Sequence, residues 1–302
     1  MLIHSLLLML LWCAGGVASA AGNEDILTES QRAWVREHPT VRWAPEQDYG
    51  PFVYADAIGN VQGLSVDFLR AIGEKTGLEF TPTAPMSLKD ILEQAKQRQV
   101  DVITSLRPTP ERAAYLSFTT PYISVPTTLV VRHDAAERNL AQMDGKPVAV
   151  GRGYAVEAYV RAHYPKVQWV AVSSDNEALR KLKTGEVQGM VADAASVEFV
   201  AKAERWNAYR MVGRVGFDYP LSFAYRSDWP QLGEILQRGM NALTPADRAQ
   251  LTRQWLKPET SLQWQFGDMQ PMLLAGGLLV LAVVVALWAH RGASKSDPPD
   301  QS

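Results

Sequence analysis

Arg112 is the residue whose setting in this sequence points most directly to ligand chemistry. An apolar run at residues 100–103 predicts a buried strand, and two prolines and a turn that carries Glu111 and Arg112 follow it. A guanidinium placed just past a strand can donate two parallel hydrogen bonds to a carboxylate, an arrangement that lysine cannot reproduce. A surface ion pair with Glu111 is the alternative interpretation.

Two further polar groups accompany this arginine, and an acid lies beyond a second strand. Ser105 and Arg107 precede the turn, and Asp193 follows an apolar run at residues 187–192. Arg107 either brings a second cation to the anionic end of a ligand or points to solvent. An Asp after a strand commonly caps the next helix, a role that does not exclude ligand binding. Because ligands of open α/β sheets bind beyond the carboxyl ends of strands, residues 105–112 and Asp193 are expected to face one crevice.

The elements that must position these residues are marked by helix caps and short apolar runs. A hydroxyl residue followed three positions later by a polar or acidic residue predicts a helix start. Four such starts occur, at residues 28–31, 87–90, 174–177 and 244–247, the last with proline at the first helical position. Strands are predicted at residues 41–44, 100–103, 127–132, 147–150, 187–192 and 221–225. This alternation predicts an α/β fold with largely parallel sheets.

A weak internal repeat predicts two lobes. Residues 88–105 and 176–193 each run from a capped helix through a polar turn to a short apolar strand that ends in a polar residue. Residues 127–132 are expected to leave the first lobe, and residues 212–217 to return to it. The final helices, within residues 231–256, are expected to pack on the first lobe.

Composition limits the functions that these residues can serve. The chain has 302 residues, 47% hydrophobic and 21% charged, enough for two lobes with a sizeable core. Its net charge of −2 offers no broad basic field for nucleic acid. The single cysteine, Cys13, lies in the N-terminal apolar run, which argues against disulfides and thiolate sites in the mature protein.

Catalytic and metal-binding patterns find little support. The five histidines are scattered without a pair at metal-ligand spacing, and the sequence contains no phosphate loop or nucleophile elbow. Asp101 and Glu111 could form an acid–base pair, but strand-end carboxylates near arginine usually stay ionised and structural. We therefore expect no metal, no cofactor and no enzymatic activity.

The N-terminus predicts export. Residues 2–17 form an apolar run, and Ala18-Ser19-Ala20 matches a small-x-small cleavage site, so residues 1–20 are expected to be a signal peptide. Lipoprotein processing at Cys13 is the alternative, although the bulky Trp12 before it fits such processing poorly.

The C-terminus predicts a membrane anchor. Residues 272–289 carry no charge and are long enough to span a hydrocarbon core of ~30 Å. Arg291 and Lys295 follow them, so the positive-inside rule places the tail, residues 290–302, in the cytoplasm. Residues 21–270 are then expected in the periplasm, held at the inner membrane.

The motifs around Arg112 resemble those of the family 3 periplasmic solute-binding proteins. The family's T-x-E-R turn stands here as residues 109–112, and its F-S-x-P-Y segment as residues 118–122. Its G-x-D-x-D motif corresponds to residues 63–67, with Ser65 in place of the first acid. The resemblance covers roughly residues 38–257, and its closing helices are similar to those in the outer domains of BvgS-type sensor kinases.

The resemblance implies a two-lobed type II periplasmic-binding-protein (Venus flytrap) fold and assigns residues to its ligand site. Arg112 would bind the α-carboxylate of an amino acid, and Asp193 its ammonium group. The ring of Tyr49 would lie against the ligand, with packing against Phe52 as the alternative. Ser105 matches a backbone contact position. The backbone N–H groups of a helix start would lie under the carboxylate, and they belong to Gly153, Tyr154 and Ala155.

Three departures from the family pattern bear on the ligand. Leu88 replaces an aromatic residue, Gly189 changes the step before Asp193, and Arg107 stands where many members have a small hydroxyl residue. A dicarboxylate, a modified amino acid or the absence of any small ligand therefore stay open beside a neutral amino acid.

Together these features predict a membrane-tethered periplasmic domain that senses an amino-acid-like or carboxylate molecule by lobe closure. Its partner would be a sensor kinase or a cyclase. The alternative is the tethered substrate-binding subunit of an amino-acid ABC importer, with a permease as partner, and a dehydratase-like enzyme is a third interpretation. The domain is expected at residues 24–265, with lobe 1 at about 24–128 and 217–265 and lobe 2 at about 133–212.

Overall fold

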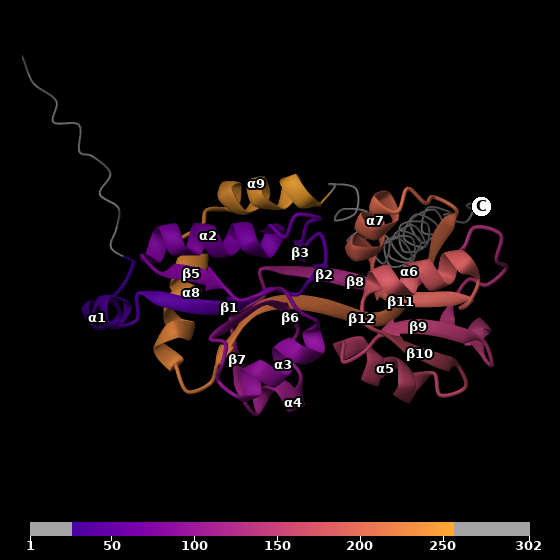
Figure 1. Cartoon of the computed structure of the whole chain (residues 1–302), viewed down its shortest axis with the longest axis horizontal. Coiled ribbons are helices and arrows are strands. Elements are labelled where there is room, and N and C mark those ends of the chain that lie inside the picture. Colours follow the sequence, from indigo (N-terminus) through magenta and orange to yellow (C-terminus); the bar gives the residue numbers. More distant parts are fainter. Residues whose placement is uncertain (1–25, 257–302) are drawn as a thin grey trace, which may run out of the picture.

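One continuous sheet runs through both lobes of the molecule (Figure 1). The computed structural model describes residues 26–256. The order of the hydrogen-bonded strands is β10-β9-β11-β8-β12-β6-β1-β5, with β7 paired to β12. These strands are β1 (Thr40–Ala44), β5 (Glu79–Pro82), β6 (Val102–Leu106), β7 (Leu116–Phe118), β8 (Ile123–Arg132), β9 (Pro147–Gly151), β10 (Gln168–Val172), β11 (Gly189–Asp193) and β12 (Tyr209–Arg226). A small second sheet contains β2 (Asp48–Tyr49), β3 (Val53–Ala55) and β4 (Val61–Gln62).

The strands β8 and β12 join the two lobes. The second half of β8 pairs with β11, and the second half of β12 pairs with β6 and β7, while the two strands pair with each other along most of their length. We call the half built on β1, β5 and β6 the first lobe and the half built on β9, β10 and β11 the second lobe. The predicted two-lobed α/β architecture is therefore confirmed, with two antiparallel crossing strands between mostly parallel sheets.

Helices cover both lobes on their outer faces (Figure 1). The first lobe carries α1 (Glu29–Glu37), α2 (Leu64–Thr76), α3 (Leu88–Lys96), α4 (Pro110–Ala113), α8 (Pro230–Asn241) and α9 (Pro245–Trp255). The second lobe carries η1 (Leu140–Met143), α5 (Ala155–His163), α6 (Asp175–Thr184) and α7 (Ala194–Ala203). Both α8 and α9 pack on α2, as the sequence predicted for the final helices.

The four helix starts predicted from capping residues are confirmed. In each, a hydroxyl oxygen accepts a hydrogen bond from the backbone N–H three residues later, which satisfies one of the free donors of the first turn. The capping residues are Thr28, Ser87, Ser174 and Thr244. All six predicted strands are also present, although β8 and β12 are longer than predicted because each continues from one lobe into the other.

Periodic apolar side chains fix α2 in the core of the first lobe. Leu64, Phe68 and Ile72 recur at helical spacing and are fully buried. The helix α8 approaches closely because it presents Gly239, where an added Cβ would lie 2.7 Å from the Ile72 side chain. Close packing of this kind resists rearrangement within the first lobe, so we expect relative movement of the lobes at the crossing strands.

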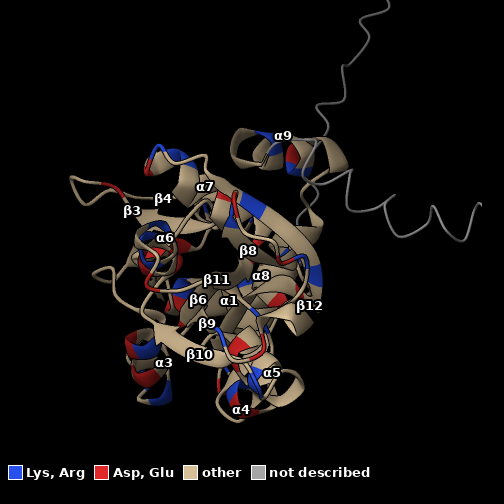
Figure 2. Ribbon diagram, turned by 90° about the vertical axis from the view of Figure 1, so that its right-hand side faces the viewer, with Lys and Arg blue, Asp and Glu red and all other residues tan. Residues whose placement is uncertain are grey.

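Charged residues of both signs are interspersed on the outer helices (Figure 2). On α3, Lys96 lies 3.5 Å from Glu93, and on α6, Lys181 lies 4.0 Å from Glu177. Exposed pairs of this kind contribute little to stability. They give these helices a solvated face with mixed charge.

The predicted signal peptide, residues 1–20, lies outside the described residues. The same holds for the predicted membrane segment at residues 272–289 and for the tail at 290–302. Within residues 26–256, we find no helix of the length and hydrophobicity needed to cross a bilayer.

Candidate functional site

The turn at Thr109 aims Arg112 between the lobes. Thr109 Oγ1 accepts a hydrogen bond from the Arg112 backbone N–H, and Pro110 occupies the first position of the short helix α4. The Arg112 side chain is buried, only 4% exposed. Its Nη1 donates to the carbonyl of Arg107 at 2.7 Å, and its Nη2 donates to the carbonyl of Gly153, in the second lobe, at 2.9 Å. A guanidinium of the first lobe thus binds the second lobe directly.

The space around Arg112 is a narrow cleft between the lobes. Its internal volume is about 20 Å³, room for about one water molecule. It is lined by Glu46, Tyr49, Leu88, Ser105, Leu106, Arg107, Arg112, Tyr154, Ala155 and Tyr219. Six of the eight predicted site residues therefore lie together, and Leu88 lies beside them. Pockets for small molecules are usually above ~300 Å³, so the lobes must separate to admit one.

Ser105 sits at an irregularity at the end of β6. The register between β6 and β12 shifts there, and Ser105 has a φ of 55°, a left-handed conformation uncommon for a residue with a side chain. Its Oγ lies 2.8 Å from Tyr122 Oη. This hydrogen bond holds the strand end against the aromatic residue of the 118–122 segment.

Arg107 is held by the crossing strand β12. Its guanidinium lies 3.6 Å from the ring centre of Phe217, a cation–π contact. It also donates to the carbonyl of Asp218. The side chain therefore lines the cleft while its charged end is bound to the connection between the lobes. The role of Arg107 toward a ligand stays a prediction.

Asp193 caps α7, as the alternative from the sequence predicted. Its Oδ1 accepts a hydrogen bond from the Ser196 backbone N–H at 2.8 Å. Asp193 is buried beside Tyr49 and does not line the cleft cavity. Burial raises the pKa of its carboxyl to about 6, although the Ser196 backbone hydrogen bond and the Tyr49 hydroxyl act to lower it.

At the start of α5, a backbone carbonyl and not an N–H group points toward Arg112. The Gly153 N–H, which the sequence assigned to an anion, donates to Glu157 Oε2 at 2.8 Å, while the Gly153 carbonyl accepts from Arg112. The side chain of Tyr154 reaches into the cleft and donates from its hydroxyl to Glu46 Oε1 at 2.8 Å. Tyr154 belongs to the second lobe and Glu46 to the first, so this hydrogen bond is a second direct link across the cleft.

Glu46 is a cleft residue that the sequence reasoning missed. It follows β1 by two residues, and its carboxyl is buried. Burial raises its pKa from 4.5 to about 7, against the lowering effects of the Tyr154 hydrogen bond and the Arg112 charge. Asp48 and Asp193 raise it further. The sequence did contain a feature that could have identified Glu46, because this acid lies just past a strand and three residues before Tyr49.

Replacing Glu46 by glutamine is expected to change how stability depends on pH. An acid whose pKa is raised on folding stabilises the folded state when protonated, and that contribution is lost as pH rises from 4.5 through about 7. When the pH is raised from 5 to 8, the unfolding free energy of the wild-type protein should fall by about 2–3 kcal/mol more than that of Glu46→Gln. This estimate uses about 1.36 kcal/mol for each unit by which the pKa is shifted. Urea unfolding of both proteins at several pH values measures this difference. Parallel curves would contradict the assignment.

Two more residues of this region escaped prediction. Tyr219 Oη accepts from the Val156 backbone N–H at 3.3 Å, which connects β12 to α5 at the wall of the cleft. Asp175 is buried at the start of α6. Residues 174–177 were predicted only as a helix start. The acid directly after the capping Ser174 was the feature of the sequence that could have indicated a buried carboxyl here.

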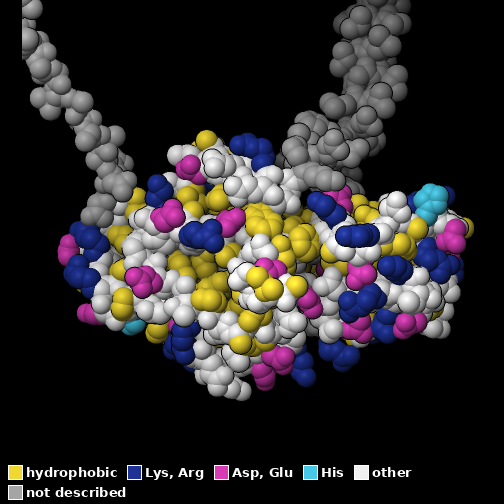
Figure 3. All heavy atoms as spheres, turned by 45° about the horizontal axis from the view of Figure 1, so that its top comes forward, with side chains coloured by type: hydrophobic (Ala, Val, Ile, Leu, Met, Phe, Trp, Pro, Cys, Tyr) yellow, Lys and Arg dark blue, Asp and Glu magenta, His cyan; other side chains and the backbone are white. Residues whose placement is uncertain are grey.

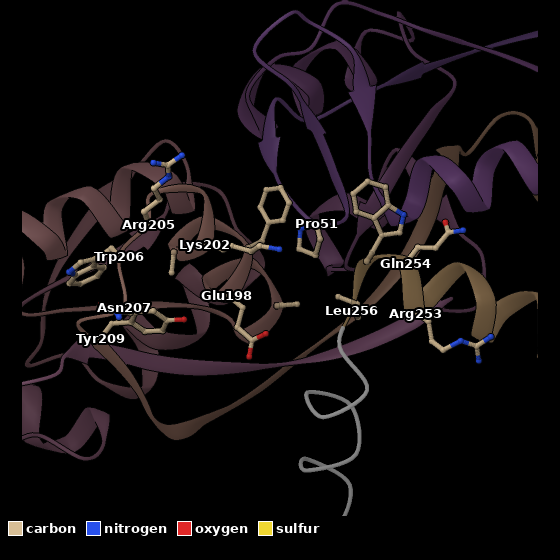
Figure 4. A pocket seen from close by; sticks show the side chains of 14 residues that line it. Pro51, Glu198, Lys202, Arg205, Trp206, Asn207, Tyr209, Arg253, Gln254 and Leu256 are labelled. Carbon is tan, nitrogen blue, oxygen red and sulfur yellow. The ribbon is translucent and has the colours of Figure 1, made fainter.

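A larger hollow of about 760 Å³ lies outside the cleft, between α7 and the end of α9 (Figure 4). Hydrophobic side chains gather in the middle of the face seen in Figure 3. The hollow is lined by residues of both lobes, among them Pro51, Phe199, Trp206 and Trp255. None of the site residues predicted from the sequence lines it, although Lys202, Arg205 and Arg253 place three cationic side chains there.

Comparisons with known proteins cover most of the described residues. The family described as bacterial extracellular solute-binding proteins, family 3, matches residues 41–258. The sensor protein EvgS of Escherichia coli (strain K12) is 26% identical over 232 residues, 76% of this chain and 19% of that protein. The ABC transporter arginine-binding protein 1 of the same strain is 29% identical over 150 residues, 49% of this chain and 61% of that protein.

Solved structures share the fold. The periplasmic VFT2 domain of BvgS from Bordetella pertussis superposes with a TM-score of 0.70 at 20% identity, covering 76% of this chain and 98% of that structure. The chain spans about a fifth of the length of the sensor proteins that it matches.

Proposed function

The chain belongs to the bacterial extracellular solute-binding proteins of family 3, and on this basis we propose that its two lobes close on a small molecule that carries a carboxylate. The observation that supports this most strongly is the buried guanidinium of Arg112, which already bonds to both lobes. A ligand carboxylate can take the place of the Gly153 carbonyl on Arg112 and keep the link between the lobes. Amino acids and their analogues are the ligands that this arrangement favours.

Lobe closure follows from contacts that a ligand makes with both lobes at once. The cleft walls come from the first lobe through Tyr49, Ser105 and Arg112 and from the second through Tyr154 and Ala155. A ligand that binds this set stabilises the closed state over the open state by its difference in affinity for the two. The hydrogen bond between Tyr154 and Glu46 helps to hold the same closed geometry.

A panel of candidate ligands tests this proposal by thermal unfolding of the purified protein. The panel holds L-arginine, L-citrulline, L-glutamine, L-glutamate, succinate and putrescine. A ligand present at a hundred times its dissociation constant should add about 2.7 kcal/mol and raise the melting temperature by several degrees. Stabilisation by compounds with a carboxylate and none by putrescine supports the proposal. Stabilisation by putrescine alone would contradict it.

We further propose that the domain is exported by the segment at residues 1–20 and tethered in the inner membrane by residues 272–289, and that closure is sensed. The similarity to EvgS and BvgS sensor proteins supports sensing. In the structure, the rings of Phe199 and Tyr54 lie 4.7 Å apart, and those of Tyr54 and Trp255 lie 6.2 Å apart. These three aromatic residues connect α7 of the second lobe to the end of α9, from which the chain continues toward residues 272–289.

Replacing Tyr54 by alanine is expected to break this aromatic connection while leaving the cleft intact. In the wild-type protein, a bound carboxylate ligand should slow amide hydrogen exchange both at the cleft and in α9. In Tyr54→Ala the cleft should stay protected, and the protection of α9 should fall to the ligand-free level. Equal protection of α9 in both proteins would show that the aromatic residues transmit nothing.

The alternative function is substrate capture for an importer, and the similarity to the arginine-binding protein of an ABC transporter favours it. Import and sensing use the same cleft, so cleft variants do not separate them. Co-purification from native membranes does: a permease argues for import, and a kinase or cyclase argues for sensing. The relatives are binding and sensor proteins, and we propose no catalytic role.

A further inference from the structure

Asp175 is a buried acid without a partner. It is 1% exposed, and neither of its carboxylate oxygens has a hydrogen-bond partner among the described residues. The Ser196 hydroxyl is close enough to act on the pKa of Asp175, but it donates to the carbonyl of Gly50 at 2.9 Å. The helix cap of α6 is supplied by Ser174. Asp175 therefore has only the favourable position of an acid in the first turn of α6 to offset the cost of its burial.

Asp175 does not line the cleft cavity itself, but it belongs to a helix that packs against an element of the cleft wall. Its helix α6 packs against β2, which carries Tyr49. Its carboxyl acts on the pKa values of three tyrosines that line the cleft, namely Tyr49, Tyr154 and Tyr219. Burial raises the pKa of Asp175, and the carboxyl groups of Asp193 and Glu46 raise it further. Three acids thus share one buried region.

The charges of this region are unbalanced when all three acids are ionised. Glu46, Asp175 and Asp193 carry three negative charges, and the arginines at the cleft are Arg107 and Arg112. A ligand with one net positive charge would balance them. Buried charges are stable in proteins only when they are paired or neutralised, so without a ligand the raised pKa values favour protonated acids, and a cationic group can pair with the acid that ionises.

We propose that Asp175 binds a positively charged group of the ligand, such as the guanidinium or ammonium group of a cationic amino acid. This inference rests on the proposed function, because it assigns the carboxylate of the same ligand to Arg112. The ligand would lie with its carboxylate toward Arg112 and its cationic end toward α6. Asp175 then determines specificity for the charge of the ligand.

A pair of nearly isosteric ligands tests the inference. L-Arginine and L-citrulline differ in that a neutral ureido group replaces the guanidinium, while the carboxylate and ammonium groups are shared. Calorimetric titration should show wild-type protein binding L-arginine about 30-fold more tightly, as expected for a charge-assisted hydrogen bond in a buried site. In Asp175→Asn this preference should fall to about threefold or less, through weaker binding of L-arginine.

Glu177→Gln is the matched control. Glu177 lies in the same first turn of α6 and carries the same charge, but it binds the exposed Ser173. This variant should keep the full preference for L-arginine. The wild-type comparison of the two ligands needs no variant, so it stands even if Asp175→Asn fails to fold.

The outcomes separate this inference from the proposed function. Equal wild-type affinity for L-arginine and L-citrulline, or an unchanged preference in Asp175→Asn, would overturn the role of Asp175 and leave carboxylate binding intact. If neither these two compounds nor any other carboxylate of the panel binds, the proposed function itself fails, and the inference with it.

Discussion

Arg112→Ala is expected to weaken the binding of every carboxylate ligand at least about 100-fold, a loss of about 2.7 kcal/mol. The wild-type guanidinium can offer two parallel charge-assisted hydrogen bonds in a site that excludes water. Without this guanidinium, the ligand carboxylate would lose its water and gain no hydrogen-bond partner. Binding would then carry the full desolvation cost of an unpaired charged group. Calorimetric titration of wild type and variant with L-arginine and L-glutamine measures the loss.

Two further variants make this result specific. Arg112→Lys should recover little of the affinity, because an ammonium group cannot reproduce the forked geometry. Arg161→Ala removes an arginine of the second lobe that pairs with Glu157 at 3.0 Å on the exposed side of α5, and it should bind ligands as the wild type does. A folded Arg112→Ala protein that keeps its affinity within threefold would remove Arg112 from the site.

Asp101→Ala is expected to produce the largest loss of stability, about 3 kcal/mol, the lower end of the range for breaking a buried ion pair. Asp101 is 2% exposed and accepts hydrogen bonds from the backbone N–H and the guanidinium of Arg42 and from Nη1 of Arg226. Burial alone would raise its pKa, but these bonds outweigh burial and lower it. Removal of the acid leaves two arginines without their partner where β1, β6 and β12 meet.

Denaturant unfolding of Asp101→Ala and of a surface control measures this effect. Asp134 pairs with Arg132 at 3.3 Å but is largely exposed, and Asp134→Ala should change the unfolding free energy by less than about 0.5 kcal/mol. Because the pKa of Asp101 is lowered on folding, its contribution is present above pH 3.8 and is lost as pH falls below that value. Similar stability of the two variants at pH 7 would contradict the structural role of Asp101.

The sequence predicted the parts of the fold that depend on local chemistry. Capping residues such as Thr28 and Ser174 form hydrogen bonds within one turn, so their pattern alone identifies a helix start. The T-x-E-R turn is a similar case, since Thr109 and Pro110 set the start of α4 and thereby the direction of Arg112. Asp101 was correctly expected to be ionised and structural rather than part of an acid–base pair with Glu111.

The sequence could not predict which side chains meet across the lobes. Glu46 and Tyr154 are 108 residues apart, and their hydrogen bond crosses from one lobe to the other. The contact of Arg107 with Phe217 depends in the same way on the crossing strand β12. The burial of Asp175 depends on the packing of α6 against β2, which no local pattern encodes.

The most direct test of lobe closure on a carboxylate ligand is a distance between the lobes, measured with and without ligand. Spin labels at Glu93→Cys in α3 and Ala162→Cys in α5, in a Cys13→Ser background, report on the two sides of the cleft by pulsed electron paramagnetic resonance. Without ligand we expect distances longer than those of this structure, because a cleft of about 20 Å³ must open to admit one. Saturation with the tightest carboxylate of the panel should give one short distance that matches the structure. An unchanged distribution, with binding shown by calorimetry, would contradict the account.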